Sequence, residues 1–510
     1  MRLSKSHSVS LRRKAAETQI STSISPKRGT TVLRNSLFKP SPTGRAANFL
    51  IPALTPTTPS KAKSSPKIRR TRTKLTPRGQ NKDESASFNR LRGSVGRSRP
   101  SELSTFQHVL NVSGLLPVKA TSPQHAKALN TSLTPRAGRQ ALPAGGKAVA
   151  RSFEAELTDF ERTEVQNWVE VYYIGRLGSK HRPNSQENNY GFDDSRGDYI
   201  LVPGDHLNYR YQIVSMLGKG SFGQVCKCLD HKTKAVVAIK LIKNKKRLYT
   251  QGLIEVKALE TLRDFDPEDS KGVVRIKASF TFRSHLCLVF EQLCYNLYEL
   301  LRSRNFKGLS MPVCRKLASQ LLATLEYTRK NRIIHCDLKP ENVMLSKPTA
   351  AQIKLIDFGS CCFSDQRIYT YIQSRFYRAP EVILGIPYTT QIDVWSFGCI
   401  LAELYTGKPL FAGETEHEQM LCIMEVFGPP AKSMLEKGSR AGLFFQENSE
   451  PKIAPNSKGK MHFPRSKTLS QALDCEDEAF LDFLKCCFEW EPERRLTPEE
   501  GLQHQWLAVS

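Results

Sequence analysis

The 510-residue chain has no apolar run of about 18 residues, the length that a helix needs to cross a bilayer. Its first residues, MRLSKSH, have no apolar segment behind their charges, so the pattern of a secretory signal is missing as well. None of the 13 cysteines form a C-x-x-C pair, the spacing of many structural zinc sites, and the first of them is Cys226. We therefore expect a protein without membrane spans in a reducing compartment, namely the cytoplasm and the nucleus.

Acidic residues are scarce in residues 1–150, which hold 4 Asp and Glu against 28 Lys and Arg, a balance of +24. The other 360 residues hold 45 acidic and 48 basic side chains, so nearly all of the net charge of +27 lies in the first part. This distribution excludes a uniformly basic nucleic-acid-binding globule. Ser, Thr and Pro dominate the same part, and we predict a disordered basic tail over residues 1–150.

The densest basic run of the tail is KIRRTRTK, residues 67–74. Such a run can serve as a nuclear-import signal or an acidic-surface contact, and it can equally be a solvated linker. Binding of nucleic acid through the tail is disfavoured because the tail has few aromatic residues on which bases could stack.

Strand-like segments precede helix-like segments in the rest of the chain. We predict extended segments at 171–174 and 198–203 within an accessory region, residues 151–210, and then five strands, at 211–216, 224–228, 235–242, 274–280 and 286–290. After residue 295, Val313, Leu317, Leu321 and Leu325 recur every four residues, and residues 393–405 read as a buried helix. The pattern predicts an α+β fold with a strand-rich lobe, a helix-rich lobe and the chemistry between them.

Glycine concentrates in G-K-G-S-F-G, residues 218–223, between two predicted strands. Glycine lets the backbone approach phosphate oxygens where a side chain would collide. A Rossmann unit would open a helix directly after this motif, whereas residues 224–228 have strand composition. The segment therefore indicates a glycine-rich loop over ATP.

Lys240 ends the apolar segment V-A-I-K. A buried ammonium needs acceptors, because burial alone would remove its proton. Phosphate oxygens and the carboxylate of Glu255, in the helical segment 253–262, would supply them. The alternative is a lysine that extends from a strand end to the surface, and V-A-I-K alone favours that interpretation.

The segment H-C-D-L-K-P-E-N, residues 335–342, combines a carboxylate, an ammonium and an amide. Asp337 would accept the proton of an attacking hydroxyl, Lys339 would neutralise charge on the transferred phosphoryl group, and Asn342 would bind Mg²⁺. Asp357, in I-D-F-G, would be a second ligand of Mg²⁺, with Mn²⁺ as an alternative ion. In the segment A-P-E, Glu381 could pair with Arg495.

These segments occur in the order and spacing of the protein-kinase signature set, and residues 211–507 resemble a eukaryotic protein kinase catalytic domain with its bilobal fold. Cys336, N-L-Y-E-L at 296–300 and Y-T-Y-I-Q-S-R-F-Y-R-A-P-E at 369–381 are similar to the dual-specificity tyrosine-phosphorylation-regulated kinases. D-H-L-N-Y-R-Y at 205–211 resembles the DH box of that family, and 157–175 the accessory region of its class II. Two further segments, 405–413 and 422–428, resemble the fourth vertebrate member.

The resemblance implies which residues contact ATP. They come from the glycine-rich loop, the lysine–glutamate pair and the hinge, with Phe290 as gatekeeper. The set is Leu217, Gly218, Lys219, Gly220, Ser221, Phe222, Gly223, Gln224, Val225, Lys240, Glu255, Phe290, Glu291, Gln292 and Leu293.

The resemblance also implies a dual specificity. Members of the family phosphorylate the second tyrosine of their own Tyr-x-Tyr loop, here Tyr371, and then serine or threonine of protein substrates, often before proline. Many kinases have an arginine at the position of Cys336 that binds the phosphorylated loop, so a phosphate on Tyr371 would need other cations. Arg375 and Arg378 lie four and seven residues further on and could supply them.

A non-catalytic scaffold with a kinase fold is the competing interpretation. It is disfavoured because Lys240, Asp337, Asn342 and Asp357 are all present. We therefore expect a monomeric enzyme that uses ATP and acts on protein substrates, not on membranes or nucleic acid.

Overall fold

The computed structural model describes residues 141–508, apart from residues 185, 348–349 and 368. The predicted tail and its basic run at 67–74 therefore lie outside the described residues, except for residues 141–150. Helix α3, Gly146–Ser152, crosses the predicted boundary between tail and accessory region. Among the described residues, no helix combines the length and the apolar composition needed to cross a membrane.

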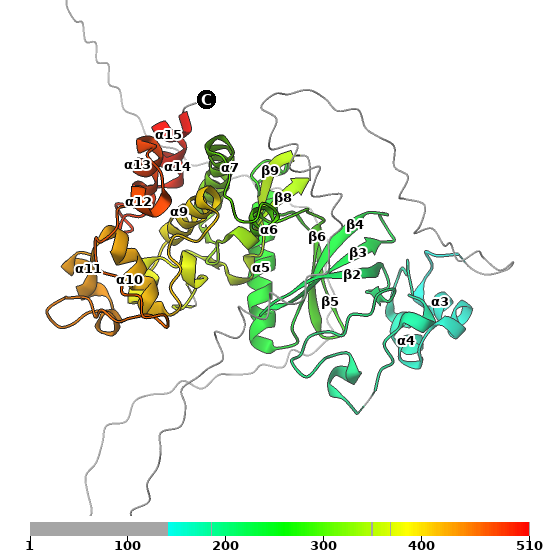
Figure 1. Cartoon of the computed structure of the whole chain (residues 1–510). Coiled ribbons are helices and arrows are strands. Elements are labelled where there is room, and N and C mark those ends of the chain that lie inside the picture. The colour runs from blue at the N-terminus through cyan, green and yellow to red at the C-terminus, as the bar shows by residue number, and fades with distance from the viewer. Residues whose placement is uncertain (1–140, 185, 348–349, 368, 509–510) are drawn as a thin grey trace, which may run out of the picture. The chain divides into compact units, whose positions relative to one another are not determined.

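A six-stranded antiparallel sheet forms the first lobe (Figure 1). Its strand order is β1-β2-β3-β4-β6-β5. The strands are β1 His206–Leu207, β2 Tyr211–Lys219, β3 Gly223–Asp230, β4 Val236–Ile242, β5 Ile276–Phe282 and β6 His285–Glu291. All five strands predicted from residue 211 onward are confirmed. Short connections join β2 to β3, β3 to β4 and β5 to β6, which are antiparallel neighbours, whereas residues 243–275 connect β4 to β5.

The two faces of this sheet pack against different partners. Along β4, Val237, Ile239 and Leu241 belong to a core shared with the accessory region, whereas Ile242 packs with helix α5, Lys246–Asp264, and with the second lobe. Successive side chains of a strand point to opposite faces, so one strand serves both cores. Lys240 therefore faces the second lobe, on the same face as Ile242.

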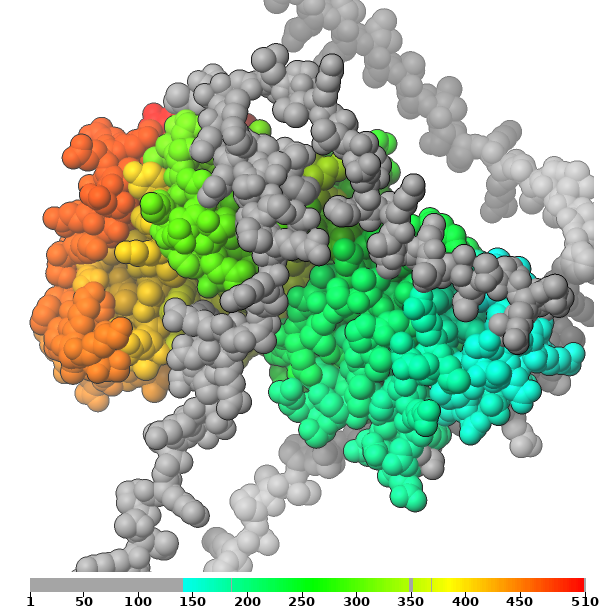
Figure 2. All heavy atoms as spheres, turned by 45° about the vertical axis from the view of Figure 1, so that its right-hand side comes forward, coloured from blue at the N-terminus to red at the C-terminus, as the bar shows by residue number. Residues whose placement is uncertain are grey.

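The accessory region consists of short helices that cover one face of the sheet. They are η2 Glu154–Glu156, α4 Asp159–Glu164, η3 Val165–Asn167, η4 Leu177–Ser179 and η5 Asn188–Gly191. Figure 2 shows these cyan residues directly against the green residues of the sheet. The strand predicted at 171–174 is wrong, because only Val171 pairs, through a single bridge to Ala144. Within 198–203, Tyr199 makes a similar single bridge to Asp193.

The second lobe is helical, as predicted. Its helices are α6 Leu297–Ser303, α7 Met311–Lys330, α8 Pro380–Leu384, α9 Gln391–Thr406, α10 Glu416–Phe427, α11 Lys432–Lys437, α12 Leu469–Leu473, α13 Glu478–Cys487, α14 Pro498–Leu502 and α15 Gln505–Ala508. The four-residue stripe predicted around Leu317 lies on α7, and the buried helix predicted at 393–405 lies on α9. The protein thus has the bilobal α+β fold that its sequence indicates.

Short strands and 3₁₀ turns between α7 and α8 hold the loops that face the sheet. They are β7 Ile333–Ile334, η6 Pro340–Asn342, β8 Val343–Lys347, β9 Ala350–Leu355, η7 Phe358–Ser360, β10 Cys362–Phe363 and η8 Arg375–Tyr377. Strand β8 pairs with β9 and β7 with β10. These two small ladders fix the segments 335–342 and 357–359 side by side.

Candidate active site

Lys240 lies at the centre of a buried ionic cluster. Its Nζ donates to both carboxylate oxygens of Glu255 on α5, at 2.7 and 2.8 Å, and to Asp357 Oδ1 at 2.8 Å. Burial alone would lower the pKa of Lys240, but the charges of Asp357 and Glu255 raise it above its usual value. The predicted pairing with Glu255 is confirmed, and the surface-directed alternative for Lys240 is wrong.

Asp357 joins this cluster from the second lobe. Its backbone has φ of +59°, in the left-handed region, and its side chain accepts from the Gly359 amide. Burial would raise the pKa of Asp357, but the Lys240 ammonium lowers it to about 2. The carboxylate is therefore ionised at neutral pH, the form that binds a metal ion.

Asp393 on α9 fixes the backbone of the segment 335–342. Asp393 accepts the backbone amides of His335 and Cys336, at 2.8 and 3.1 Å. His335 Nε2 in turn lies 2.9 Å from the Ile356 carbonyl, directly before Asp357. Sequence analysis missed Asp393, although a carboxylate within an otherwise apolar helix is a signal that buried donors need it.

Asp337 presents its carboxylate to a hydroxyl and an ammonium. Asp337 Oδ1 accepts from Ser374 Oγ at 2.7 Å, and Oδ2 accepts from Lys339 Nζ at 2.6 Å. The side-chain amide of Asn342 donates to the Asp337 carbonyl at 2.8 Å, and the Ile356 amide donates to the Asn342 carbonyl at 2.9 Å. The structure thus brings Lys240, Asp337, Asn342 and Asp357 together, as predicted.

Asn342 and Asp357 have the donor chemistry of a Mg²⁺ site. Asn342 uses its amide nitrogen for the Asp337 carbonyl, so its amide oxygen is left to bind a cation. Asp357 adds an ionised carboxylate, and oxygen atoms of these two kinds are the ligands that Mg²⁺ prefers. These two residues therefore fit the ion assigned to them, although the same donors would also accept Mn²⁺.

The three glycines of the loop between β2 and β3 have different roles. A Cβ atom at Gly218 or Gly220 would meet open space, whereas one at Gly223 would lie 2.0 Å from the Leu241 carbonyl oxygen. Gly223 is therefore needed for the close approach of β3 to β4. Gly218 and Gly220 carry no side chain that would keep a ligand away from the backbone. The Phe222 ring lies 6.0 Å from Lys240 Nζ, so the loop reaches over the cluster.

Two side chains of this loop and strand contact the accessory region instead. Lys219 Nζ lies 3.1 Å from Asp194 and 2.9 Å from Asp198, and the Gln224 amide donates to the Tyr199 carbonyl. The structure therefore does not bring the side chains of Lys219 and Gln224 to the Lys240 cluster. Leu217 is half-exposed beside Gly218, on the same strand.

The hinge residues follow at the end of β6. Phe290 is buried in the main core, and Glu291 accepts from Lys354 Nζ at 2.5 Å and from the Arg275 amide at 2.9 Å. The Gln292 side-chain amide donates to the Leu293 carbonyl at 2.8 Å. Of the hinge groups, the Leu293 carbonyl thus already has an internal partner.

Tyr371 is half-exposed, and two guanidinium groups lie near its ring. Arg378 stacks 4.1 Å from the ring centroid, as predicted for a cation near Tyr371, and Arg440 lies at 5.7 Å. Glu416 holds both, at 3.1 Å from Arg378 and 3.0 Å from Arg440. Arg375 instead donates to the Glu414 carbonyl, so the second cation at the ring is Arg440, which sequence analysis missed.

The end of the tyrosine-bearing loop is fixed by a fully buried ion pair. Arg495 donates to Glu381 at 2.7 and 3.0 Å, and both side chains have no exposed surface. The predicted pair is confirmed as a buried one. It fixes α8, and with it the end of the loop that carries Tyr371.

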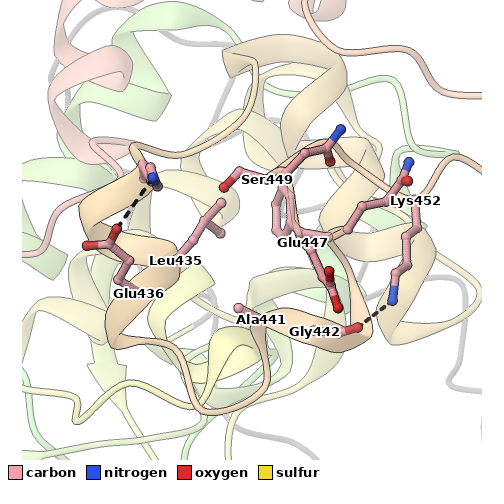
Figure 3. A pocket seen from close by; sticks show the side chains of 11 residues that line it. Leu435, Glu436, Ala441, Gly442, Glu447, Ser449 and Lys452 are labelled. Atoms are coloured by element: carbon pink, nitrogen blue, oxygen red, sulfur yellow. Dashed lines mark hydrogen bonds and ion pairs between the residues drawn. The ribbon is translucent and has the colours of Figure 1, made fainter.

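A separate hollow lies between α11 and the loop that follows it, and Figure 3 shows the side chains that line it. Its volume is about 850 Å³. None of the predicted site residues lines it. Two of its basic side chains are engaged within it, since Lys452 donates to the Gly442 carbonyl and Lys432 pairs with Glu436. The Lys240 cluster and the loop of Asp337 therefore remain the candidate active site.

Known proteins match this arrangement. Residues 211–507 match the family model described as "Protein kinase domain". The chain is 50% identical over 357 residues to the DYRK-family kinase pom1 of Schizosaccharomyces pombe, with 69% of this chain and 33% of that protein covered. It is 47% identical over 366 residues to dual specificity tyrosine-phosphorylation-regulated kinase 2 of Drosophila melanogaster, covering 71% and 51%.

A third relative is covered over more of its length. Dual specificity tyrosine-phosphorylation-regulated kinase 4 of Homo sapiens is 48% identical over 360 residues, covering 70% of this chain and 69% of that protein. The matches thus span between a third and about two thirds of these relatives, and their similar identities do not single out one member. The chain belongs to the protein kinases and, among them, to the dual specificity tyrosine-phosphorylation-regulated kinase family.

Proposed function

We propose that this chain is a dual-specificity protein kinase that phosphorylates its own Tyr371 and then transfers the γ-phosphate of ATP to serine or threonine of protein substrates. One observation carries the proposal. The Lys240–Glu255–Asp357 cluster adjoins the network of Asp337, so a phosphate-binding cation, metal ligands and a proton acceptor share one site. A scaffold would not need all of these groups in place.

The hydroxyl of Ser374 supports the role of Asp337. Ser374 Oγ donates to Asp337 Oδ1 at 2.7 Å, while Lys339 Nζ contacts the other oxygen at 2.6 Å. A substrate hydroxyl that enters beside Lys339 would meet the same carboxylate in a similar way. Asp337 then accepts the proton as the oxygen attacks phosphorus, and Lys339 balances charge on the transferred group.

The site residues divide the remaining tasks. Lys240, held by Glu255, binds phosphate oxygens, and the uncovered backbone at Gly218 and Gly220 approaches them. Asn342 and Asp357 would hold Mg²⁺, which neutralises negative charge on the phosphates when it is bound. Hinge backbone groups at Glu291 and Leu293 orient the adenine.

A phosphate on Tyr371 would be bound by Arg378 and Arg440. Both guanidinium groups already lie near the ring and share Glu416, so a phosphate could replace this carboxylate as their common partner. Arg375 would need to leave the Glu414 carbonyl to join them. Binding of the phosphate would then fix the loop that carries Tyr371, because Arg378 also donates to the carbonyls of Ile372 and Gln373 in that loop.

Mass spectrometry of the recombinant full-length protein tests this function. We expect phosphate on Tyr371, and its absence from active protein would contradict the autophosphorylation step.

Arg378→Ala and Arg440→Ala should lower activity towards a protein substrate by about tenfold or more while Tyr371 remains phosphorylated, since charge-assisted bonds contribute about 1.5–3 kcal/mol. Arg494→Ala, at an exposed arginine, is the matched control and should retain activity.

The class of the kinase and its substrate preference are proposed mainly on the resemblance to the family, and the class also on one set of contacts. We propose that the chain is a class II member, whose accessory region braces the glycine-rich loop through the contacts of Lys219 with Asp194 and Asp198. Substrates with proline after the target residue are proposed on the same resemblance. Residence in cytoplasm and nucleus is proposed from composition, and microscopy of a variant without residues 67–74 tests it.

A further inference from the structure

A cluster of four metal-ligand side chains lies far along the chain from the active-site residues. Helix α10 presents Glu418, Cys422 and Glu425 at positions i, i+4 and i+7, which share one helix face. His462 meets this face from the segment between α11 and α12. Glu418, Cys422 and His462 are buried, and their ligand atoms all lie within 4.8 Å of one another.

The distances in the cluster resemble the edges of a zinc coordination sphere. His462 Nε2 lies 3.4 Å from Glu418 Oε1 and 3.9 Å from Cys422 Sγ. Around a tetrahedral Zn²⁺ with bonds of about 2.0–2.3 Å, neighbouring ligand atoms are about 3.3–3.6 Å apart. The two distances at His462 Nε2 thus lie within a few tenths of an ångström of that geometry, and the Cys422 and Glu418 ligand atoms lie within 4.8 Å of each other.

The other nitrogen of His462 faces a second carboxylate. His462 Nδ1 lies 3.0 Å from Glu425 Oε2. Metal-binding histidines commonly place their second nitrogen against a carboxylate, which fixes the ring and the tautomer. The contact does not have hydrogen-bond geometry, so Glu425 is a neighbouring carboxylate that could become an orienting residue when a metal binds at Nε2, the nitrogen that lies near Glu418 and Cys422.

The backbone holds His462 against the helix. The Arg465 amide donates to the Met424 carbonyl at 2.9 Å, and the Lys467 amide donates to the Glu425 carbonyl at 3.1 Å. Asn456 donates to Glu418 Oε1 at 2.8 Å from the same segment. The ligand atoms are thus fixed in place by bonds that do not depend on an ion.

From this geometry we propose that Glu418, Cys422 and His462 bind a divalent transition metal, Zn²⁺ in the first place, with Glu425 as a positioning residue for His462. Binding converts the Cys422 thiol to a thiolate and releases one proton to solvent, while His462 binds as the neutral imidazole. Lys460, 3.9 Å from Glu425, offsets part of the negative charge of the ligands. The metal would fasten the segment after α11 to α10.

The alternative arrangement is a protonated His462 in ion pairs with Glu418 and Glu425. It needs no thiol, so Cys422 distinguishes the two. A second cluster, Asp482, Cys486 and His504, offers a matched control, because it also combines a carboxylate, a thiol and an imidazole but its Asp482 is exposed.

The experiment measures metal content of the purified full-length kinase after equilibration with Zn²⁺ and removal of free ion. We expect about one zinc per chain in the wild type and in Cys486→Ser, and loss of it in Cys422→Ser. Glu425→Gln should weaken the affinity by about 10–100-fold, as expected for an orienting carboxylate. Substitution with Co²⁺ should give a thiolate-to-metal absorption band in the wild type.

Three outcomes would overturn the proposal. They are a wild-type chain that retains no zinc, zinc that persists in Cys422→Ser, and zinc that is lost in Cys486→Ser. The Co²⁺ spectrum of the wild type is independent of whether any variant folds, and a spectrum without the thiolate band would also overturn it.

Discussion

Two buried ionic clusters lie at different sides of the same sheet, and they are built in opposite ways. In the accessory region one carboxylate, Glu161, faces three basic groups: Lys180 at 2.5 Å, His206 at 2.8 Å and Arg283 at 3.5 Å. At the active site one ammonium, Lys240, faces two carboxylates. The first cluster collects basic groups around Glu161, with Glu164 as a second carboxylate at Arg283, and the second collects two carboxylates around Lys240.

The two clusters also differ in how closed they are. The four side chains around Glu161 are at most 3% exposed, whereas Asp357 at the active site keeps 38% of its side chain exposed. A closed cluster cannot exchange partners without unfolding part of the protein, so it fixes geometry. An open one can exchange a protein partner for a ligand. Burial of charge therefore supports structure at one side of the sheet and chemistry at the other.

Replacement of the proton acceptor should give the largest effect on function with the smallest effect on stability. Asp337→Asn removes the carboxylate that we propose as the acceptor of the hydroxyl proton, and we expect phosphoryl transfer to fall by roughly two to four orders of magnitude. The amide can still accept from Ser374, so the free energy of unfolding should change little. Steady-state phosphorylation of a peptide measures the first quantity, and urea unfolding measures the second.

Two results would contradict this expectation. Unchanged phosphoryl transfer by Asp337→Asn would exclude Asp337 as the acceptor. A large loss of stability would show that the contacts of Asp337 with Lys339 and Ser374 are structural as well. Binding of ATP to the variant, which should persist, separates a catalytic defect from misfolding.

The contacts within the active site follow from its sequence motifs to different degrees. Lys240, Asp337, Asn342 and Asp357 were predictable because each sits in a short motif with a chemical reason for its residue type. The partner Glu255 was predictable because a buried ammonium needs a carboxylate. What the motifs omit is the support beneath them, above all Asp393, which has no motif of its own.

Long-range contacts outside the motifs were beyond prediction from the sequence. Arg440 reaches Tyr371 from a segment with no signature, and its contacts with α8 and with Glu416 on α10 bring it there. Lys219 stands in the glycine-rich loop, yet its ammonium pairs with Asp194 and Asp198 of the accessory region. The extended segment at 171–174 failed as a strand because pairing depends on a neighbour, which composition does not reveal.

The closed cluster should show the largest effect on stability. Glu161→Gln leaves the ammonium of Lys180 and the guanidinium of Arg283 buried with less negative charge, and we expect a loss of about 3–5 kcal/mol in the free energy of unfolding. Glu170→Gln, at an exposed carboxylate that pairs with Lys232, is the matched control and should have no measurable effect. Urea unfolding of the three proteins measures both.

A similar loss in both variants would mean that burial is not what distinguishes the accessory cluster.

Burial alone would raise the pKa of Glu161, but His206 and Lys180 lower it well below its usual range. A lowered pKa gives stability that is present above the unfolded-state pKa of about 4.3 and is lost in acid. The difference between wild type and Glu161→Gln should therefore shrink as the pH falls below that value.

A buried carboxylate without a cation should respond to pH in the opposite direction. Glu403 on α9 accepts from the Tyr377 hydroxyl at 2.6 Å, and burial raises the pKa of Glu403 to about 7. The folded protein then holds a proton that the unfolded chain has lost, so stability falls as the pH rises from about 4.5 to 7. We expect wild type to lose about 2–3 kcal/mol more than Glu403→Gln between pH 5 and 7.5.

Urea unfolding of both proteins at the two pH values isolates this contribution, because all other groups are shared. Glutamine keeps an acceptor for Tyr377 and carries no charge, so it resembles the protonated form. A wild-type curve parallel to that of Glu403→Gln would contradict the raised pKa. Together with the experiment on Glu161, it shows whether the charge of the partner decides the direction in which stability changes with pH.

The smallest effect concerns a single neutral bond in the accessory region. Asn208 has φ of +52° and accepts from the Trp168 indole nitrogen at 3.1 Å. Asn208→Gly tolerates this backbone and loses only the bond, at about 1 kcal/mol, whereas Asn208→Ala adds a left-handed penalty of about 1–2 kcal/mol. If alanine were no more destabilising than glycine in thermal or urea unfolding, the turn between β1 and β2 would relax freely, and the accessory region would be less rigid than its ionic cluster indicates.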